Sequence, residues 1–152
     1  MSVAFRRESD EEHLEPRFEL PIPPGPNLVT PRGLALIEAR VAELEARLAD
    51  PLPEEERNAV LRDARYWHAR QASAQLAPAP SGETVAIGTL VTYRRDNQSR
   101  TVEIVGHDES DPATARIGFN APLVRAMLGA ELGDEIELPN GHTLTILAIA
   151  LA

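Results

Sequence analysis

Four carboxylates stand close together where two helical sequence patterns meet, at Asp50, Glu54, Glu55 and Glu56. Carboxylate oxygens are the ligands that Mg²⁺ prefers in proteins, so one interpretation of this cluster is a divalent-metal site. The other is a solvated helix start, because acidic side chains in a first turn complement the positive end of the helix dipole. We favour the second interpretation, and the first remains open.

Other residue types that carry chemistry are absent or scattered. The chain has no cysteine, which removes disulfides and thiolate metal sites. No serine lies in a G-x-S-x-G turn, and no glycine-rich phosphate loop appears. The histidines lack both the i, i+4 spacing of a zinc-binding helix and a nearby nucleophile, and we interpret all four as surface or turn residues: His13, His68, His107 and His142. We therefore expect no catalytic residue, no cofactor and no enzymatic activity.

Composition narrows the class of partner. The chain has 152 residues, 43% of them hydrophobic, and a formal net charge of −9. Affinity for nucleic-acid phosphates is built from clustered Lys and Arg, so strong independent binding to nucleic acid is not expected. No apolar run approaches the roughly 18 residues that span a bilayer, and the first residues lack the apolar core of a signal peptide. These features predict a cytoplasmic protein with a protein partner and no membrane contact.

Two helices are predicted between residues 30 and 77. Thr30 is a suitable N-cap, and Pro31 suits the first helical position because its missing N–H needs no partner there. A helix over 31–49 follows from an apolar stripe at spacings of three and four, at Leu34, Ile37, Val41, Leu44 and Leu48. Pro51 and Pro53 end it.

The second helix begins in the glutamate run and is expected to pack against the first. Its candidate inner face is Val60, Ala64, Trp67, Gln71 and Ala74. Since the connection is short, the two helices must lie antiparallel as a coiled-coil hairpin. Trp67 falls on the stripe and is predicted to pack in the seam, whereas Tyr66 and Arg65 lie off it and are weak candidates for partner contacts.

The remaining segments complete an α+β architecture. Residues 1–29 are charged and then proline-rich and predict an extended, mobile arm, and 78–82 predict a linker. Residues 83–152 predict a small antiparallel sheet with one short helix near 120–128. The expected strands cover 84–95, 99–108, 115–119, 134–141 and 142–150, with turns at 96–99 and at Asn140-Gly141.

Two stretches resemble the Gre family of bacterial transcription elongation factors. They are VTPRGLALIEARVAELEARL, at the first helix, and EIVGHDESDPATARIGFNAPLVRAMLGAELGDEIEL, at residues 103–138. The resemblance implies an FKBP-like C-terminal domain that docks on RNA polymerase at the rim of its secondary channel. It also implies that the coiled coil points into that channel. We expect a monomer whose partner is the polymerase.

The same resemblance suggests which residues contact the polymerase. The helix after Asn120 would present its first turn, with Ala121, Pro122 and Arg125. Ala121 stands where the family commonly has serine. An acidic loop containing Asp108, Glu109 and Asp111 would face basic residues of the polymerase, although turn chemistry also explains it.

The hairpin tip decides which activity the resemblance implies. Cleavage-stimulating members carry two carboxylates in a tip motif that holds a second metal for phosphodiester hydrolysis. That motif is missing here, and the helices are shorter, so the chain is more similar to the short-hairpin, Rnk-like variant. We therefore expect an elongation regulator that does not stimulate transcript cleavage.

Three alternatives remain. The first is a true cleavage factor that uses the acids at Asp50 and Glu54–Glu56. The second is an FKBP-like prolyl isomerase or chaperone, whose pocket would need more aromatic lining than Tyr93 and Phe119 supply. The third is a coiled-coil adaptor with no role at the polymerase.

Overall fold

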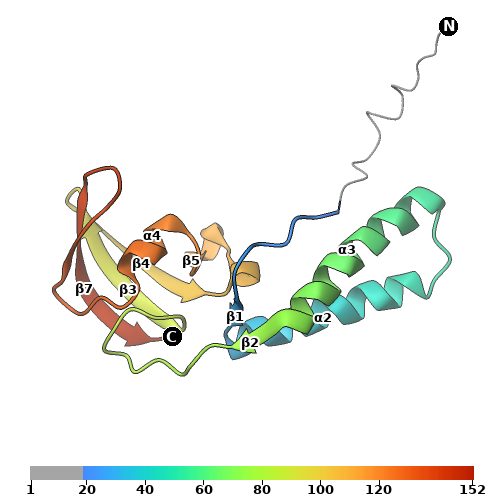
Figure 1. Cartoon of the computed structure of the whole chain (residues 1–152), viewed down its shortest axis with the longest axis horizontal. Helices are drawn as coiled ribbons and strands as arrows, with labels where there is room; N and C mark the ends of the chain where they lie inside the picture. Colours follow the sequence, from blue (N-terminus) through green and yellow to red (C-terminus); the bar gives the residue numbers. More distant parts are fainter. Residues whose placement is uncertain (1–18) are drawn as a thin grey trace, which may run out of the picture.

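The computed structural model describes residues 19–152 and has two lobes joined by a narrow middle (Figure 1). One lobe is a helical hairpin of α2 (Pro31–Leu48) and α3 (Glu54–Ser73). The other is a five-stranded sheet with one short helix. Between them lies a two-stranded parallel sheet of β1 (Asn27–Val29) and β2 (Ala74–Leu76). The first 18 residues of the predicted arm lie outside the described residues.

The hairpin forms largely as the sequence pattern predicts. The Thr30 hydroxyl caps α2 by accepting a hydrogen bond from the Gly33 N–H at 2.9 Å. Leu44, Val60 and Ala64 form a buried cluster near the tip, and Trp67 packs against it from one side. The Arg40 guanidinium lies 5.4 Å from the centre of the Trp67 ring, a cation–π contact.

The inner face of α3 differs from the predicted stripe at its C-terminal end. Gln71 was expected inside but is exposed, whereas Arg70 is 2% exposed. The reason lies outside the hairpin, because α3 there leaves α2 and meets β1 and the sheet domain. The helix also ends at Ser73, and Ala74 enters β2 with extended backbone angles.

The arm does not extend to residue 29 as expected. Residues 27–29 pair in parallel with 74–76, so that Leu28 lies opposite Gln75. Asn27 is 3% exposed and Val29 is equally buried. The two ends of the hairpin are therefore tied together at its base before the chain continues to the second lobe.

The sheet has the strand order β5-β4-β3-β7-β6. Its long strands are β3 (Thr89–Arg95), β4 (Gln98–Val105) and β7 (Thr143–Leu151), and its edges are β5 (Arg116–Gly118) and β6 (Glu135–Glu137). The turn between β3 and β4 has Asp96 and Asn97 at φ of 54° and 64°, the left-handed geometry of a tight hairpin. The Asn140-Gly141 turn likewise precedes β7.

One edge corrects the prediction of a wholly antiparallel sheet. β5 pairs in parallel with β4, with Ile117 opposite Ile104. Two 3₁₀ turns, η1 (His107–Glu109) and η2 (Pro112–Thr114), carry the chain back along β4 before β5 begins. The first long strand also starts at Thr89 rather than 84, because residues 86–89 form a turn closed by the Thr89 hydroxyl.

The short helix α4 (Pro122–Met127) covers one face of the sheet. Its buried residues Val124 and Met127 join a core whose other fully buried members include Val91, Ile104, Leu144 and Ile146. The predicted α+β fold, a helical hairpin followed by a small sheet domain with one helix, is confirmed. None of the helices in residues 19–152 combines the length and the hydrophobicity needed to cross a membrane.

Candidate functional site

The joint between the hairpin and the sheet domain contains a buried ion pair. Arg70 of α3 donates from Nε to Asp108 Oδ2 at 2.7 Å, and the two side chains are 3% and 6% exposed. The Tyr66 hydroxyl, one turn earlier on α3, donates to the other oxygen of Asp108 at 2.5 Å. Arg70 also donates from Nη2 to Asn27 Oδ1, and the Asn27 amide donates back to the Arg70 carbonyl. Three distant segments, β1, α3 and η1, thus meet at Arg70.

The surroundings of the Tyr66 hydroxyl favour its protonated form, which donates the hydrogen bond to Asp108. Burial, followed by the hydrogen bond to Asp108, raises the pKa of the Tyr66 hydroxyl well above its ordinary value. Tyr66 therefore remains protonated and keeps donating to the carboxylate at any physiological pH. With its charge balanced by Arg70 and both oxygens bonded, the Asp108 carboxylate is a fully satisfied buried group.

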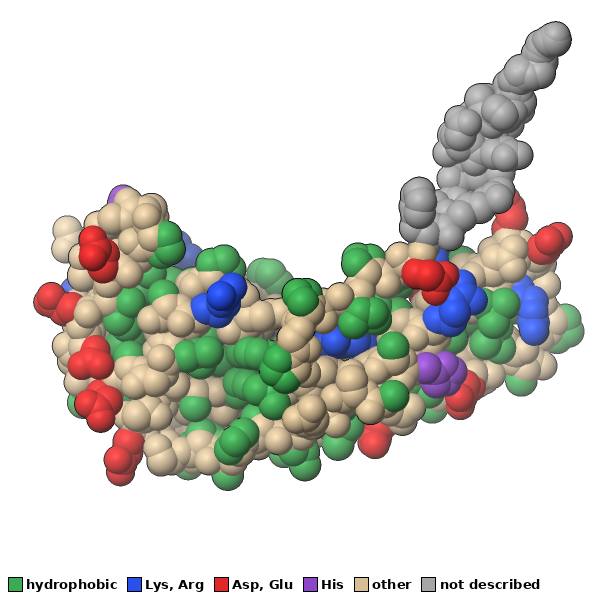
Figure 2. All heavy atoms as spheres, viewed as in Figure 1, with side chains coloured by type: hydrophobic (Ala, Val, Ile, Leu, Met, Phe, Trp, Pro, Cys, Tyr) green, Lys and Arg blue, Asp and Glu red, His purple; other side chains and the backbone are tan. Residues whose placement is uncertain are grey.

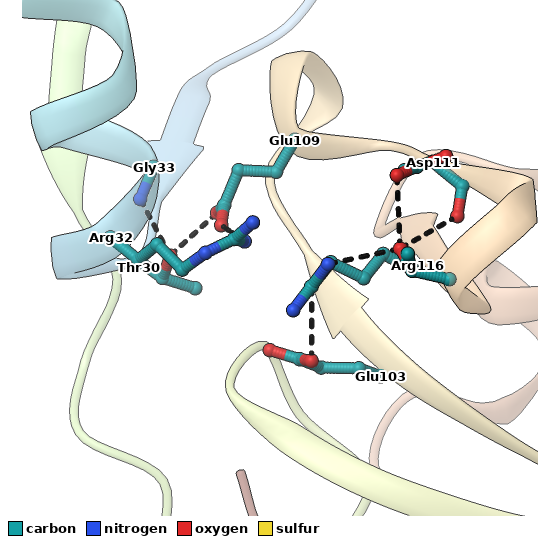
Figure 3. Close-up of polar contacts among 8 residues, drawn as sticks. Thr30, Arg32, Gly33, Glu103, Glu109, Asp111 and Arg116 are labelled. Atoms are coloured by element: carbon teal, nitrogen blue, oxygen red, sulfur yellow. Dashed lines mark hydrogen bonds and ion pairs between the residues drawn. The ribbon is translucent and has the colours of Figure 1, made fainter.

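A second carboxylate holds the start of α2. Glu109 is 4% exposed and accepts from the Thr30 hydroxyl and from Arg32 Nη1, at 2.5 and 2.7 Å. Figure 3 shows Glu109 extending from η1 toward the first turn of α2, with Thr30 and Arg32 on either side of its carboxylate. Thr30 therefore links the two lobes and caps the helix with the same hydroxyl.

Gly33 allows this close approach. A Cβ at residue 33 would lie 2.8 Å from the Glu109 carboxyl carbon, closer than nonbonded carbons come. Gly106 is similarly placed, since a Cβ there would lie 2.6 Å from the Leu28 carbonyl oxygen of β1. Both lobes therefore meet through backbone that has no side chain at the contact.

These contacts change the interpretation of the acidic loop. The sequence suggested that Asp108 and Glu109 face basic residues of a partner, but the arginines they meet belong to this chain. Asp111 caps η2 by accepting from the Ala113 N–H, the turn role considered as the alternative. The sequence had marked Tyr66 only as a weak partner contact and had not singled out Arg70. Their i, i+4 spacing on α3 is the signal that could have paired them.

The hairpin tip shows no metal-binding arrangement. Glu56 forms an ion pair with Arg47 of the other helix at 2.9 Å, and Arg57 donates to the Leu48 carbonyl. Asp50 lies in the loop, and Glu54 and Glu55 lie in the exposed first turn of α3. Among residues 19–152, no three acidic or histidine side chains are grouped as metal ligands.

The predicted docking residues lie on the far lobe, around the start of α4. Pro122 and Arg125 are exposed, whereas Asn120 and Ala121 are half-buried. The Asn120 amide contacts His107 Nδ1 at 3.2 Å, which fixes the segment before α4 to η1. Their role in partner binding stays a prediction. Figure 2 shows acidic side chains at the end of this lobe farthest from the hairpin.

The geometry defines a class of protein: a compact α+β domain attached through buried polar contacts to a short helical hairpin, α2–α3, which we call the finger. Residues 79–151 match the family model described as transcription elongation factor, GreA/GreB, C-terminal. Over these residues the resemblance to the Gre family that the sequence suggested is confirmed.

Individual curated relatives also match part of the chain. The transcription elongation factor GreA of Maricaulis maris is 40% identical over 65 residues, 40% of this chain and 41% of that protein. GreA of Macrococcus caseolyticus is 33% identical over 76 residues, 47% of this chain and 48% of that protein. The chain thus matches less than half the length of these curated relatives.

Two solved structures overlap more of the chain but loosely. The GreA factor homolog 1 (Gfh1) of Thermus thermophilus is 18% identical, covers 82% of this chain and 99% of its own, and has a TM-score of 0.39. A GreA/GreB factor from Nitrosomonas europaea is 20% identical, with coverages of 82% and 98% and a TM-score of 0.41. Overlap this loose carries no functional meaning for the chain.

Removing Arg70 tests whether the buried pair holds the joint. Arg70→Ala leaves Asp108 buried without its cation, so the free energy of unfolding should fall by about 3 kcal/mol. Urea denaturation followed by circular dichroism measures it. Arg65→Ala is the matched control, because Arg65 pairs with Glu19 on the exposed side of the same helix and its loss should have a much smaller effect. Equal effects for the two variants would contradict a special role for Arg70.

Adding one methyl group tests the close approach at Gly33. Alanine is the better helix former, yet Gly33→Ala should destabilise the protein by about 1–3 kcal/mol, because its Cβ meets the Glu109 carboxylate. Shortening the acid in Gly33→Ala/Glu109→Asp should restore part of the loss. A Gly33→Ala variant more stable than the wild type in thermal denaturation would show that the contact is not tight.

Proposed function

We propose that this protein regulates transcription elongation by binding RNA polymerase through its C-terminal domain and presenting the short hairpin at the secondary channel. It acts in the cytoplasm and does not stimulate transcript cleavage. The observation that carries the proposal is the match of residues 79–151 to the GreA/GreB C-terminal domain, joined here to a finger held by buried polar contacts.

The dimensions and chemistry of the finger support the absence of cleavage activity. An 18-residue helix at 1.5 Å per residue gives α2 a length of about 27 Å. A catalytic metal needs carboxylates at about 2 Å in a defined geometry. The tip offers instead an ion pair from Glu56 to Arg47 and solvated acids. The finger therefore occupies space at the channel without supplying a metal site.

The exposure of α4 supports its use as the docking surface. Val124 and Met127 anchor the helix in the core, so Pro122 and Arg125 are left on the outer side. An exposed arginine beside a rigid proline turn suits contact with an acidic or polar protein surface. Asp108 and Glu109 are not part of this surface, because both are buried and paired with arginines of this chain at the joint.

Reversing the charge at Arg125 tests docking. Arg125→Glu should weaken binding to core RNA polymerase about tenfold or more, because like charges at an interface cost several kcal/mol. Fluorescence anisotropy with labelled protein at moderate salt measures it. Arg94→Glu, an exposed arginine of β3 with the same charge change, should bind as the wild type does. Wild-type protein that does not bind the polymerase would refute the proposal.

Backtracked elongation complexes test what the bound protein does. With binding established, the wild-type protein should leave the RNA 3′ end intact in the presence of Mg²⁺, while a cleavage-competent Gre factor shortens it in a parallel reaction. Adding this protein to that reaction should slow the shortening by competition for the channel. Magnesium-dependent shortening by this protein alone would establish the cleavage-factor alternative.

A further inference from the structure

A recess opens on the core face of the sheet beyond the end that α4 covers. Its volume is about 590 Å³, within the range of small-molecule sites. One wall is formed by β3 and β4, and the other by the segment from η2 to β5. The lining residues are Tyr93, Arg100, Thr101, Val102, Ser110, Pro112, Ala115, Arg116 and Ile117.

Two polar groups in this recess have no partner. Tyr93 is 4% exposed as a whole residue, and its hydroxyl, which still contacts solvent, makes no hydrogen bond to any residue in the described part of the chain. Arg100 is exposed and lies directly opposite Tyr93 in the β3–β4 register, and its guanidinium forms no ion pair within residues 19–152. Directly opposed residues on one face have Cβ atoms about 5 Å apart, so both donors serve the same space.

The other arginine at the recess is already engaged. Arg116 donates from Nε to Glu103 and from Nη1 to the Thr114 hydroxyl, at 3.2 and 2.9 Å. Figure 3 shows the Arg116 guanidinium between Glu103 and the η2 turn. The Ser110 hydroxyl accepts from the Gly118 N–H, and its O–H can still donate. Arg100, Tyr93 and the Ser110 O–H are therefore the donors available to a ligand, and Arg100 carries the only charge among these three.

We propose that this recess binds a small organic oxyanion, a molecule that joins a carboxylate or phosphate to an apolar ring. A guanidinium and a phenolic O–H side by side form charge-assisted hydrogen bonds to such a group. Val102, Ile117 and Pro112 supply an apolar wall for the ring. The lining includes neither the paired side chains of the joint nor Pro122 and Arg125 of α4. The proposal does not depend on the proposed role at RNA polymerase.

Titration of the full-length ¹⁵N-labelled protein with simple probes tests the site. Phenyl phosphate and phenylacetate distinguish a phosphate ligand from a carboxylate ligand. At least one should give saturable amide shifts at residues 93, 100, 102 and 117, with a dissociation constant on the order of 1 mM. Benzyl alcohol, which lacks the charge, and inorganic phosphate, which lacks the ring, should each bind about tenfold more weakly or worse.

Two substitutions assign the binding to the unpaired donors. Arg100→Gln should weaken binding of the better probe at least about tenfold, and Tyr93→Phe, which keeps the buried ring, about threefold or more. Arg94→Gln is the matched control, because it removes the same charge from the opposite face of the neighbouring strand. It should leave the affinity unchanged.

Two results would overturn the proposal. In one, neither ring-bearing probe gives saturable binding; in the other, Arg100→Gln and Arg94→Gln change the affinity equally. Binding to core RNA polymerase, measured on the same Arg100→Gln sample, should match the wild type. Loss of probe binding with polymerase binding retained separates this site from the docking surface.

Discussion

A guanidinium and a carboxylate removed from water at one point hold the two lobes of this molecule in place. Arg70 and Asp108 are 38 positions apart in the chain and come from different lobes, yet both are almost fully buried. A buried charge is tolerated only when it is paired and its remaining hydrogen-bonding capacity is used. Asn27 and Tyr66 use that capacity, so any rotation of the hairpin that separates the pair would leave an uncompensated charge.

The surrounding backbone is adapted to that constraint. Glu109 adds a second link to the start of α2, and Gly33 and Gly106 remove the side chains that would keep the lobes apart. The parallel pairing of β1 with β2 ties together the two chain segments that leave the hairpin. These contacts fix the direction of the hairpin at its base, whereas a flexible connection alone would leave that direction free.

Local signals in the sequence predicted the elements well. Thr30-Pro31 marked the start of α2, and Asn140-Gly141 marked the turn before β7, because cap and turn chemistry depend on neighbouring residues alone. The parallel placement of β5 could not be predicted in this way, since its register depends on two irregular turns. The joint escaped prediction for the same reason: Asn27, Arg70 and Asp108 meet only in the folded chain. Arg70 was also hidden because its burial comes from the second lobe rather than from the helical stripe.

The site residues also divide into those that the sequence suggested and those that only the folded chain brings together. The docking residues around α4 were suggested by family resemblance, whereas the opposed Tyr93 and Arg100 emerge only from the strand register. Asp108 and Glu109 show how the sequence can mislead about exposure. An acidic loop is usually solvated, but here a neighbouring lobe covers it and provides its cations.

The distance between the hairpin tip and the sheet domain tests the fixed joint most directly. Because the chain has no cysteine, spin labels can be placed at Asp50→Cys and Asn140→Cys without removing native thiols. Double electron–electron resonance on the doubly labelled protein should give one narrow distance distribution. Adding Arg70→Ala to that protein should broaden the distribution. A broad distribution in the wild-type background, or one that Arg70→Ala leaves unchanged, would contradict the fixed joint.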